Sequence, residues 1–288
     1  FVSISLGQNE VPKAKRSVGN AVVMCLVSSI VLAALYLVFA DNILAMFGGT
    51  VNAETYHHSQ EYFFYITLGV PFYMFGQAMN PIIRADGNPR FAMVSTLAGA
   101  ALNIILDPIF IFGYCGEALS GTTGAAVATV IGQFCGAGMT LFFNLNKNPD
   151  IQISFKGFRP SAKAIGRIYT VGLPSIAMQC VGSLMTFGMN LILMSFSATA
   201  VAVFGVYFKL QSFVFMPIFG LNNGMVPIIS YNYGARRPGR VKKTIKLAVC
   251  YAECIMLIGF CIFQFAPDKV LGIFAASDAM LAIGIPAM

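Results

Sequence analysis

Long apolar runs recur along this chain and leave a helical membrane protein as its fold class. Seven runs, separated by more polar segments, occupy residues 22–39, 62–83, 91–113, 124–143, 168–196, 200–229 and 247–265, and an eighth begins after them. An apolar stretch of about 18 residues or more is typical of a helix that crosses a bilayer. Backbone groups in lipid must bond within their own helix. The sequence therefore predicts an all-α, polytopic membrane protein, a helical bundle with seven spans and part of an eighth.

The basic residues indicate how the spans are oriented. Charged residues make up only 10% of the chain, against about 25% in a soluble domain. If the first basic segment is cytoplasmic, 16 of the 18 Lys and Arg residues fall in cytoplasmic segments, and only Lys209 and Lys269 do not. The positive-inside rule predicts this asymmetry. The net charge of +7 therefore marks topology in an inner (plasma) membrane and argues against nucleic acid as a partner.

The stretch 77–108 contains an acid deep inside an apolar run. Asn103 precedes Asp107 by one helical turn, so the two side chains share a face. Pro108 removes a backbone hydrogen bond and frees the carbonyl of Ile104. These oxygens could bind a small cation, and an ionisable residue in lipid is a functional candidate by default. The alternative for Asp107 is a structural hydrogen bond between helices.

An internal repeat relates two basic segments and the apolar runs that follow them. The offset is 227 residues and pairs Gly7 with Gly234, Lys13 with Arg240, Lys15 with Lys242, Arg16 with Lys243, Asp41 with Asp268 and Phe47 with Phe274. Six spans separate the copies, so both have the same orientation in the membrane. Secondary transporters use such parallel repeats. The repeat predicts two lobes and, in full, about twelve helices.

These motifs resemble the MATE (multidrug and toxic compound extrusion) family, particularly its DinF-like branch. The resemblance rests on N-P-I-I-R-A-D-G-N-P-R from Asn80, L-N-I-I-L-D-P-I-F-I-F from Leu102 and G-A-A-V-A-T from Gly124, and on the basic segments after Gly7 and Gly234. It implies two six-helix lobes around a central cavity. It also implies export of organic cations, driven by inward flow of sodium ions or protons. This chain would cover about the third to ninth transmembrane helices and the start of the tenth.

The resemblance implies a cation-coupling site at Asn80, Asn103, Asp107 and Thr129. From the rise of a helix, Asp107 and Thr129 lie about 9 and 8 Å from the same face of the membrane, so these two can meet. Asn80 lies only four residues from the cytoplasmic turn, and only the resemblance places it in the site. For Asn103 and Thr129, interhelical hydrogen bonding is an equal alternative.

The expected organisation has three parts. We expect an amino-terminal lobe at 1–146 that lacks its first two helices, a cytoplasmic linker at 147–163, and a carboxy-terminal lobe at 164–288 that lacks its last helices. The first helix of the family normally supplies a second acid to the amino lobe. Gln179 stands where some relatives carry an acid in the seventh helix.

Lys209, Gln179 and Glu253 are candidate residues of a transport cavity. Lys209 and Glu253 could form an ion pair, or Lys209 could act alone in the cavity. His57 and His58 are adjacent in an expected outer loop, but no third ligand has a suitable spacing, so no metal site is predicted.

Six of the seven cysteines lie in apolar spans, Cys115 being the exception. They are expected to be small buried residues and to form neither a disulfide framework nor a metal site.

The leading functional hypothesis is a secondary antiporter that exports organic cations or drugs and uses sodium or protons as its coupling ion, without a cofactor. It would act as a monomer, with a small organic substrate and membrane lipid as its partners. A flippase for a lipid-linked oligosaccharide or similar amphiphile is the alternative, and it predicts several basic residues in the cavity. A channel is disfavoured because no ring of like residues is evident. No motif of an intramembrane enzyme is present, so the chain is not expected to be an enzyme.

Overall fold

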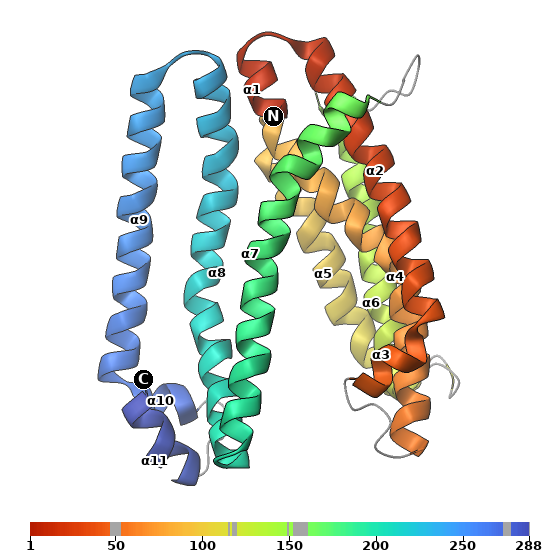
Figure 1. Ribbon diagram of the computed structural model, residues 1–288, viewed down its shortest axis with the longest axis vertical. Helices are drawn as coiled ribbons and strands as arrows, with labels where there is room; N and C mark the ends of the chain where they lie inside the picture. The colour runs from red at the N-terminus through yellow and green to blue at the C-terminus, as the bar shows by residue number, and fades with distance from the viewer. Residues whose placement is uncertain are drawn as a thin grey trace. The chain divides into compact units, whose positions relative to one another are not determined.

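The computed structural model describes residues 1–46, 53–114, 116, 120–148, 150–151, 161–272 and 278–287. These residues contain no strand and form helices α1 (Val2–Gly7), α2 (Val11–Val38), α3 (Ala40–Met46), α4 (Ala53–Ala85), α5 (Pro89–Ile111), α6 (Gly121–Asn146), α7 (Ala162–Met194), α8 (Ala198–Gly234), α9 (Pro238–Phe265), α10 (Pro267–Gly272) and α11 (Asp278–Ala287) (Figure 1). They divide into two compact units, residues 1–165 and 166–288. Most of the predicted linker at 147–163 lies outside the described residues. The predicted all-α class is confirmed.

Six helices of the described chain are long and apolar enough to cross a membrane, namely α2, α5, α6, α7, α8 and α9. The predicted second span is the exception, although α4 has 33 residues. Tyrosine, glutamine, asparagine and proline side chains lower its hydropathy. Helix α4 packs against α2, α5 and α6; of its polar side chains, Thr67 and Asn80 are buried, whereas Tyr62, Tyr73 and Gln77 are exposed.

Small residues allow α5 and α6 to approach closely in unit 1. A Cβ atom added to Gly99 would lie 2.7 Å from the carbonyl oxygen of Gly132, and one added to Gly132 would lie 2.8 Å from the carbonyl oxygen of Gly99. Gly136 faces Ser95 and Gly99 one turn further along α6. Membrane helices use such residues to bring their backbones together. This contact fixes the register of α5 against α6 where the predicted site lies.

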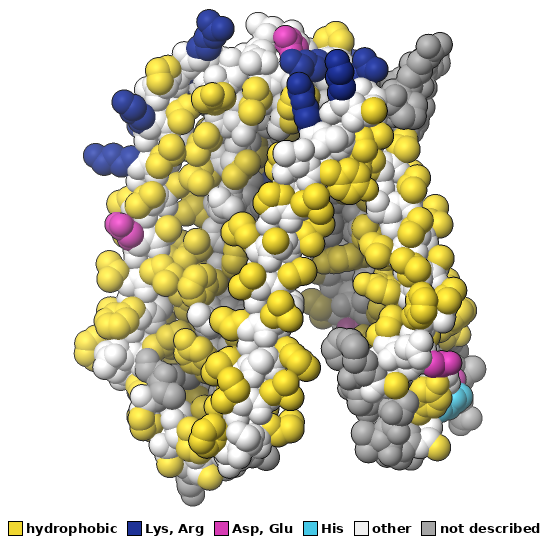
Figure 2. Space-filling model, viewed as in Figure 1, with side chains coloured by type: hydrophobic (Ala, Val, Ile, Leu, Met, Phe, Trp, Pro, Cys, Tyr) yellow, Lys and Arg dark blue, Asp and Glu magenta, His cyan; other side chains and the backbone are white. Residues whose placement is uncertain are grey.

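The core of unit 1 lies at the end where α2 and α5 begin and α4 and α6 end. Its buried members are Leu6, Ala14, Val18, Val22, Met79, Ile82 and Ile151. Figure 2 shows Lys and Arg side chains gathered at one end of each unit. The described chain therefore separates its basic residues as the positive-inside rule predicts.

The structure reproduces the 227-residue repeat in backbone detail. Asn9 and Arg236 have φ angles of 60° and 53°, and they are the non-glycine residues with positive φ in the described chain. Each is followed by an amide that donates to the carbonyl five residues back, which is the Schellman ending of a helix. Both α2 and α9 then run for 28 residues, and α10 begins 227 residues after α3. These segments agree with the predicted repeat.

The outer segment at 40–61, predicted as a polar loop, is largely helical. Helix α3 begins directly after α2, and α4 already begins at Ala53. The carboxylate of Asp41 accepts hydrogen bonds from Tyr56 (2.7 Å) and Gln60 (2.9 Å). These bonds hold the pKa of Asp41 below its ordinary value. Polar residues here extend helices beyond the apolar run, which hydropathy does not detect.

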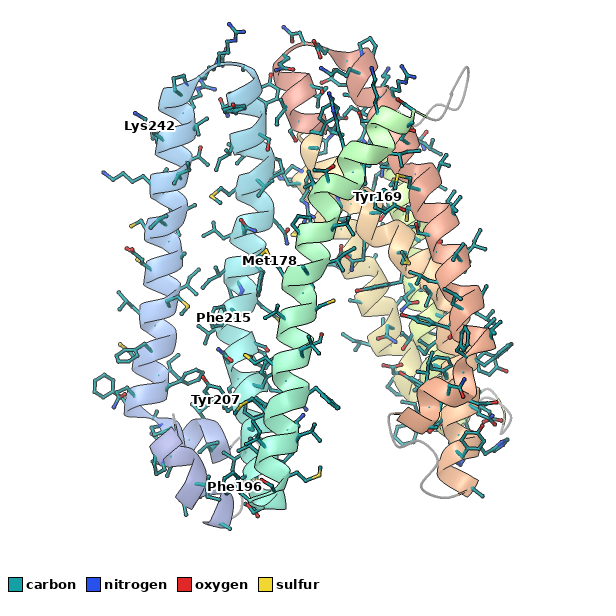
Figure 3. The ribbon with its side chains drawn as sticks, viewed as in Figure 1. Tyr169, Met178, Phe196, Tyr207, Phe215 and Lys242 are labelled. Carbon is teal, nitrogen blue, oxygen red and sulfur yellow. The ribbon has the colours of Figure 1, made fainter. Side chains whose placement is uncertain are left out.

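Unit 2 is more open than unit 1. Helix α8 packs against α9 and α11, but α7 has no buried residue, and its Met178 is 77% exposed (Figure 3).

The expectation of buried cysteines is wrong for most of them. Only Cys25 is buried, Cys135 is half-buried, and Cys180, Cys250, Cys254 and Cys261 are exposed on the open faces of α7 and α9. Cys115 lies outside the described residues.

Candidate functional site

The amide of Asn103 joins two of the predicted site residues. Its Nδ2 lies 3.0 Å from Oδ1 of Asp107 and 3.4 Å from Oγ1 of Thr129. Thr129 directs its own hydroxyl proton to the carbonyl of Ala125 (2.9 Å), so its oxygen is free to accept. Three residues from α5 and α6 thus form one chain of hydrogen bonds. All three side chains are half-buried.

Helix register explains this meeting. Asn103 lies eight residues before the end of α5, and Thr129 lies eight residues after the start of α6. Each residue is therefore about 12 Å along its helix from the loop that joins α5 to α6. Asp107 lies one turn further out. From the sequence, Asp107 and Thr129 can meet, and the structure connects them through Asn103.

Asn80 lies elsewhere, between α4 and the first turns of α5. Its Nδ2 is 2.7 Å from the carbonyl of Ala92, 3.3 Å from Oγ of Ser95 and 3.2 Å from Oγ1 of Thr96. Thr96 is eleven residues from Asp107, which is about 16 Å along a helix. The described structure does not bring Asn80 to Asp107, and its role in cation coupling stays a prediction.

Gln133 is a candidate that the sequence argument missed. It lies one turn after Thr129 on α6 and faces Gly69 of α4. Its Oε1 is buried and has no hydrogen-bond partner among the described residues. A buried amide oxygen without a partner is costly, so this oxygen is a candidate site atom. The sequence signal that could have found Gln133 is its spacing, because it follows Thr129 by four residues and therefore lies on the same face of α6.

A second polar group lies at the outer end of unit 1. Thr123 of α6 donates to Oε2 of Glu61 on α4 (2.9 Å). The other carboxylate oxygen of Glu61 lies 3.3 Å from Nε2 of His57. His57 and His58, predicted in a loop, lie in α4. No group of three or more potential metal ligands occurs in the described part of the chain.

The turn between α4 and α5 holds a buried acid, Asp86, which is 8% exposed. Its Oδ2 accepts from the amide of Asp150 at 3.4 Å, and its Oδ1 has no partner in the described chain. Burial raises the pKa of Asp86 to about 6, against weaker opposing effects that include the charge of Lys15. In the sequence, this motif indicated a family resemblance, and nothing in it predicted the burial of Asp86.

Replacing Asp86 by Asn is expected to stabilise the protein at neutral pH. The folded protein holds this proton more tightly than the unfolded chain does. The contribution to stability is therefore full below about pH 4 and is lost as the pH rises through about 6. Above about pH 7 the variant should gain roughly 1–3 kcal/mol, seen as a higher Tm, and the gain should vanish near pH 4. Equal Tm differences at all pH values, or a matching gain for the exposed control Asp268→Asn, would contradict this explanation.

The candidate cavity residues lie in unit 2 and do not pair with one another. A shallow depression on α7 is lined by Ser175, Gln179 and Ser183, which follow one another at intervals of four residues. Lys209 of α8 and Glu253 of α9 are both exposed. No ion pair joins them in the described structure, although α8 packs against α9.

Comparison with known proteins identifies the family. The model of the MatE family matches residues 1–109 and 174–287. The multidrug export protein MepA of Staphylococcus aureus is 27% identical over 281 residues, which cover 98% of this chain and 61% of that protein. MepA of Staphylococcus haemolyticus is 25% identical, with the same coverage.

Solved structures agree with the sequence comparison. An outward-facing multidrug resistance MATE family transporter of the MOP superfamily is 25% identical and has a TM-score of 0.89, over 99% of this chain and 63% of that one. A MOP superfamily transporter from Pyrococcus furiosus is also 25% identical, with a TM-score of 0.82 over 99% of this chain and 64% of that one. The chain thus spans about three fifths of the length of the proteins it matches. MatE proteins are membrane transporters rather than enzymes, in line with the sequence prediction. This multi-pass plasma-membrane chain belongs to the MatE family.

Proposed function

We propose that the full protein exports small organic cations by antiport with protons or sodium ions, and that it belongs to the DinF-like branch. The chain would then be its third to ninth transmembrane helices and the start of the tenth. The names of the relatives support a drug-export role, since both are multidrug export proteins.

The observation that carries this proposal is the chain Asp107–Asn103–Thr129 between α5 and α6. A carboxylate among apolar helices is costly unless it has a function or a strong partner. Its hydrogen-bond partner in the described structure is a neutral amide at 3.0 Å, which does not cancel a negative charge. A proton or a sodium ion would cancel it.

Arrival of the cation would change the contact between the two helices. With Asp107 neutralised, the amide of Asn103 would no longer be held by a full negative charge. The hydrogen bond between Asn103 and Thr129 would then change in strength. A ligand shifts a conformational equilibrium only by its differential affinity for the two states. The cation would therefore favour one packing of α5 on α6, and the substrate the other.

The flippase alternative is not favoured. It requires several basic residues in a cavity, and the apolar spans of the described chain hold only Lys209 well away from their ends. Multidrug export is also what the matched relatives are named for.

The test is transport of a fluorescent organic cation by the full-length protein in proteoliposomes. A pH gradient and a sodium gradient are imposed one at a time, each with and without an ionophore that dissipates it. We expect one of the two gradients to drive accumulation and the matching ionophore to abolish it. Accumulation that neither gradient changes would overturn the antiport proposal.

A further inference from the structure

The segment 236–246 places six basic side chains at one end of unit 2. They are Arg236, Arg237, Arg240, Lys242, Lys243 and Lys246, and all six are exposed. None forms an ion pair with a residue that the structure describes. Figure 3 shows Lys242 pointing outward from the first turns of α9. The nearest acid along α9 is Glu253, seven residues beyond Lys246.

The repeat supplies an internal comparison at the start of α2. There, Lys13 forms an ion pair with Glu10 at 2.6 Å, and Lys15 acts on the buried Asp86. The residue that corresponds to Glu10 in the second copy is Arg237, at the same offset of 227. The backbone of the two turns is alike, but Lys13 of the first copy has an acidic partner, whereas none of the six cations of the second copy forms an ion pair with a described residue.

Exposed aromatic and aliphatic side chains place this basic segment at the membrane interface. Tyr231 and Tyr233, near the end of α8, are 45% and 69% exposed, and tyrosine is enriched at the headgroup level of bilayers. Ile245 and Leu247 of α9 are also exposed, so an apolar surface begins next to the basic side chains of segment 236–246. Charge and apolar surface meet within two turns of one helix.

We infer that segment 236–246 is a binding surface for anionic phospholipid headgroups of the cytoplasmic leaflet. Basic clusters directly cytoplasmic of a membrane helix attract such lipids. Exposed guanidinium and ammonium groups without acidic partners offer donors that match a phosphate. The acyl chains of the same lipid would lie along the apolar face of α9. This lipid site is independent of the cation site between α5 and α6.

The test compares two charge-matched double variants of the full-length protein. Arg240→Gln/Lys243→Gln removes two charges from the segment, and Lys13→Gln/Arg16→Gln removes two at the repeat-equivalent positions. Each purified protein is equilibrated with mixed micelles of phosphatidylglycerol and phosphatidylcholine, and native mass spectrometry measures the ratio of the bound lipids. Micelles have no sides, so a purely topological role of the charges cannot alter this ratio.

We expect the first variant to lose phosphatidylglycerol preference by about fivefold or more, and the second by less than about twofold. The charge-preserving variant Arg240→Lys/Lys243→Arg should keep the preference, and higher ionic strength should weaken it in the unsubstituted protein. An equal loss in both Gln variants, or no loss in the first, would overturn the inference. Size-exclusion elution and Tm establish that each variant is folded.

Discussion

The Asp107→Asn variant of the full-length protein is expected to lose cation-driven export while it still folds. Asn has nearly the shape of Asp and can still bond to Asn103, so the contact between α5 and α6 survives. It cannot hold a proton or a sodium ion by charge. Coupling between two ligands typically changes affinity by about 5- to 150-fold, and a loss in this range is expected in gradient-driven accumulation of the substrate.

The control is Asp268→Asn, the same substitution at an exposed acid of α10. It should export like the unsubstituted protein. The variant Asp107→Glu keeps the charge and should retain part of the activity. If Asp107→Asn exported normally under both pH and sodium gradients, Asp107 would be only a structural hydrogen-bond acceptor.

Gly132→Ala is expected to destabilise unit 1 strongly. Its new Cβ would lie 2.8 Å from the carbonyl oxygen of Gly99 and 3.0 Å from Cβ of Asn103. Backbone cannot move aside as a flexible side chain can, so α5 and α6 must separate. Overpacking of this kind costs about 1–3 kcal/mol and should lower Tm by several degrees, at about 2–4 °C per kcal/mol.

Gly138→Ala is the matched control on the same helix, because a Cβ there meets no atom within 4 Å. It should leave Tm unchanged or raise it slightly, since alanine is a better helix former than glycine by about 1 kcal/mol. Gly132→Ala should also weaken export, because the contact of Asn103 with Thr129 depends on the same approach. Equal Tm values for the two variants would contradict the packing described for α5 and α6.

Much of the fold follows from the sequence because lipid imposes strong constraints. Apolar runs predicted seven spans, six of which correspond to helices long and apolar enough to cross a membrane in the described chain, and the paired segments after Gly7 and Gly234 predicted the repeat. Both signals depend on local composition and spacing. The α5 part of the site also followed, because Asn103 and Asp107 are one turn apart and must share a face.

What the sequence could not predict depends on contacts between distant segments. Asn80 bonds to Ser95 and Thr96 because α4 and α5 cross at this point. The burial of Asp86 requires the segment at Asp150 to fold over the turn. None of these contacts leaves a periodic pattern in the chain.

Equilibrium binding of an organic cation to the purified full-length protein is the most direct test of Asp107 as the coupling residue. Linkage requires that an ion which weakens substrate binding be itself displaced by the substrate. The account predicts that substrate affinity in the unsubstituted protein falls with rising proton or sodium concentration, and that Asp107→Asn abolishes this dependence. The same ion dependence in both proteins would contradict it.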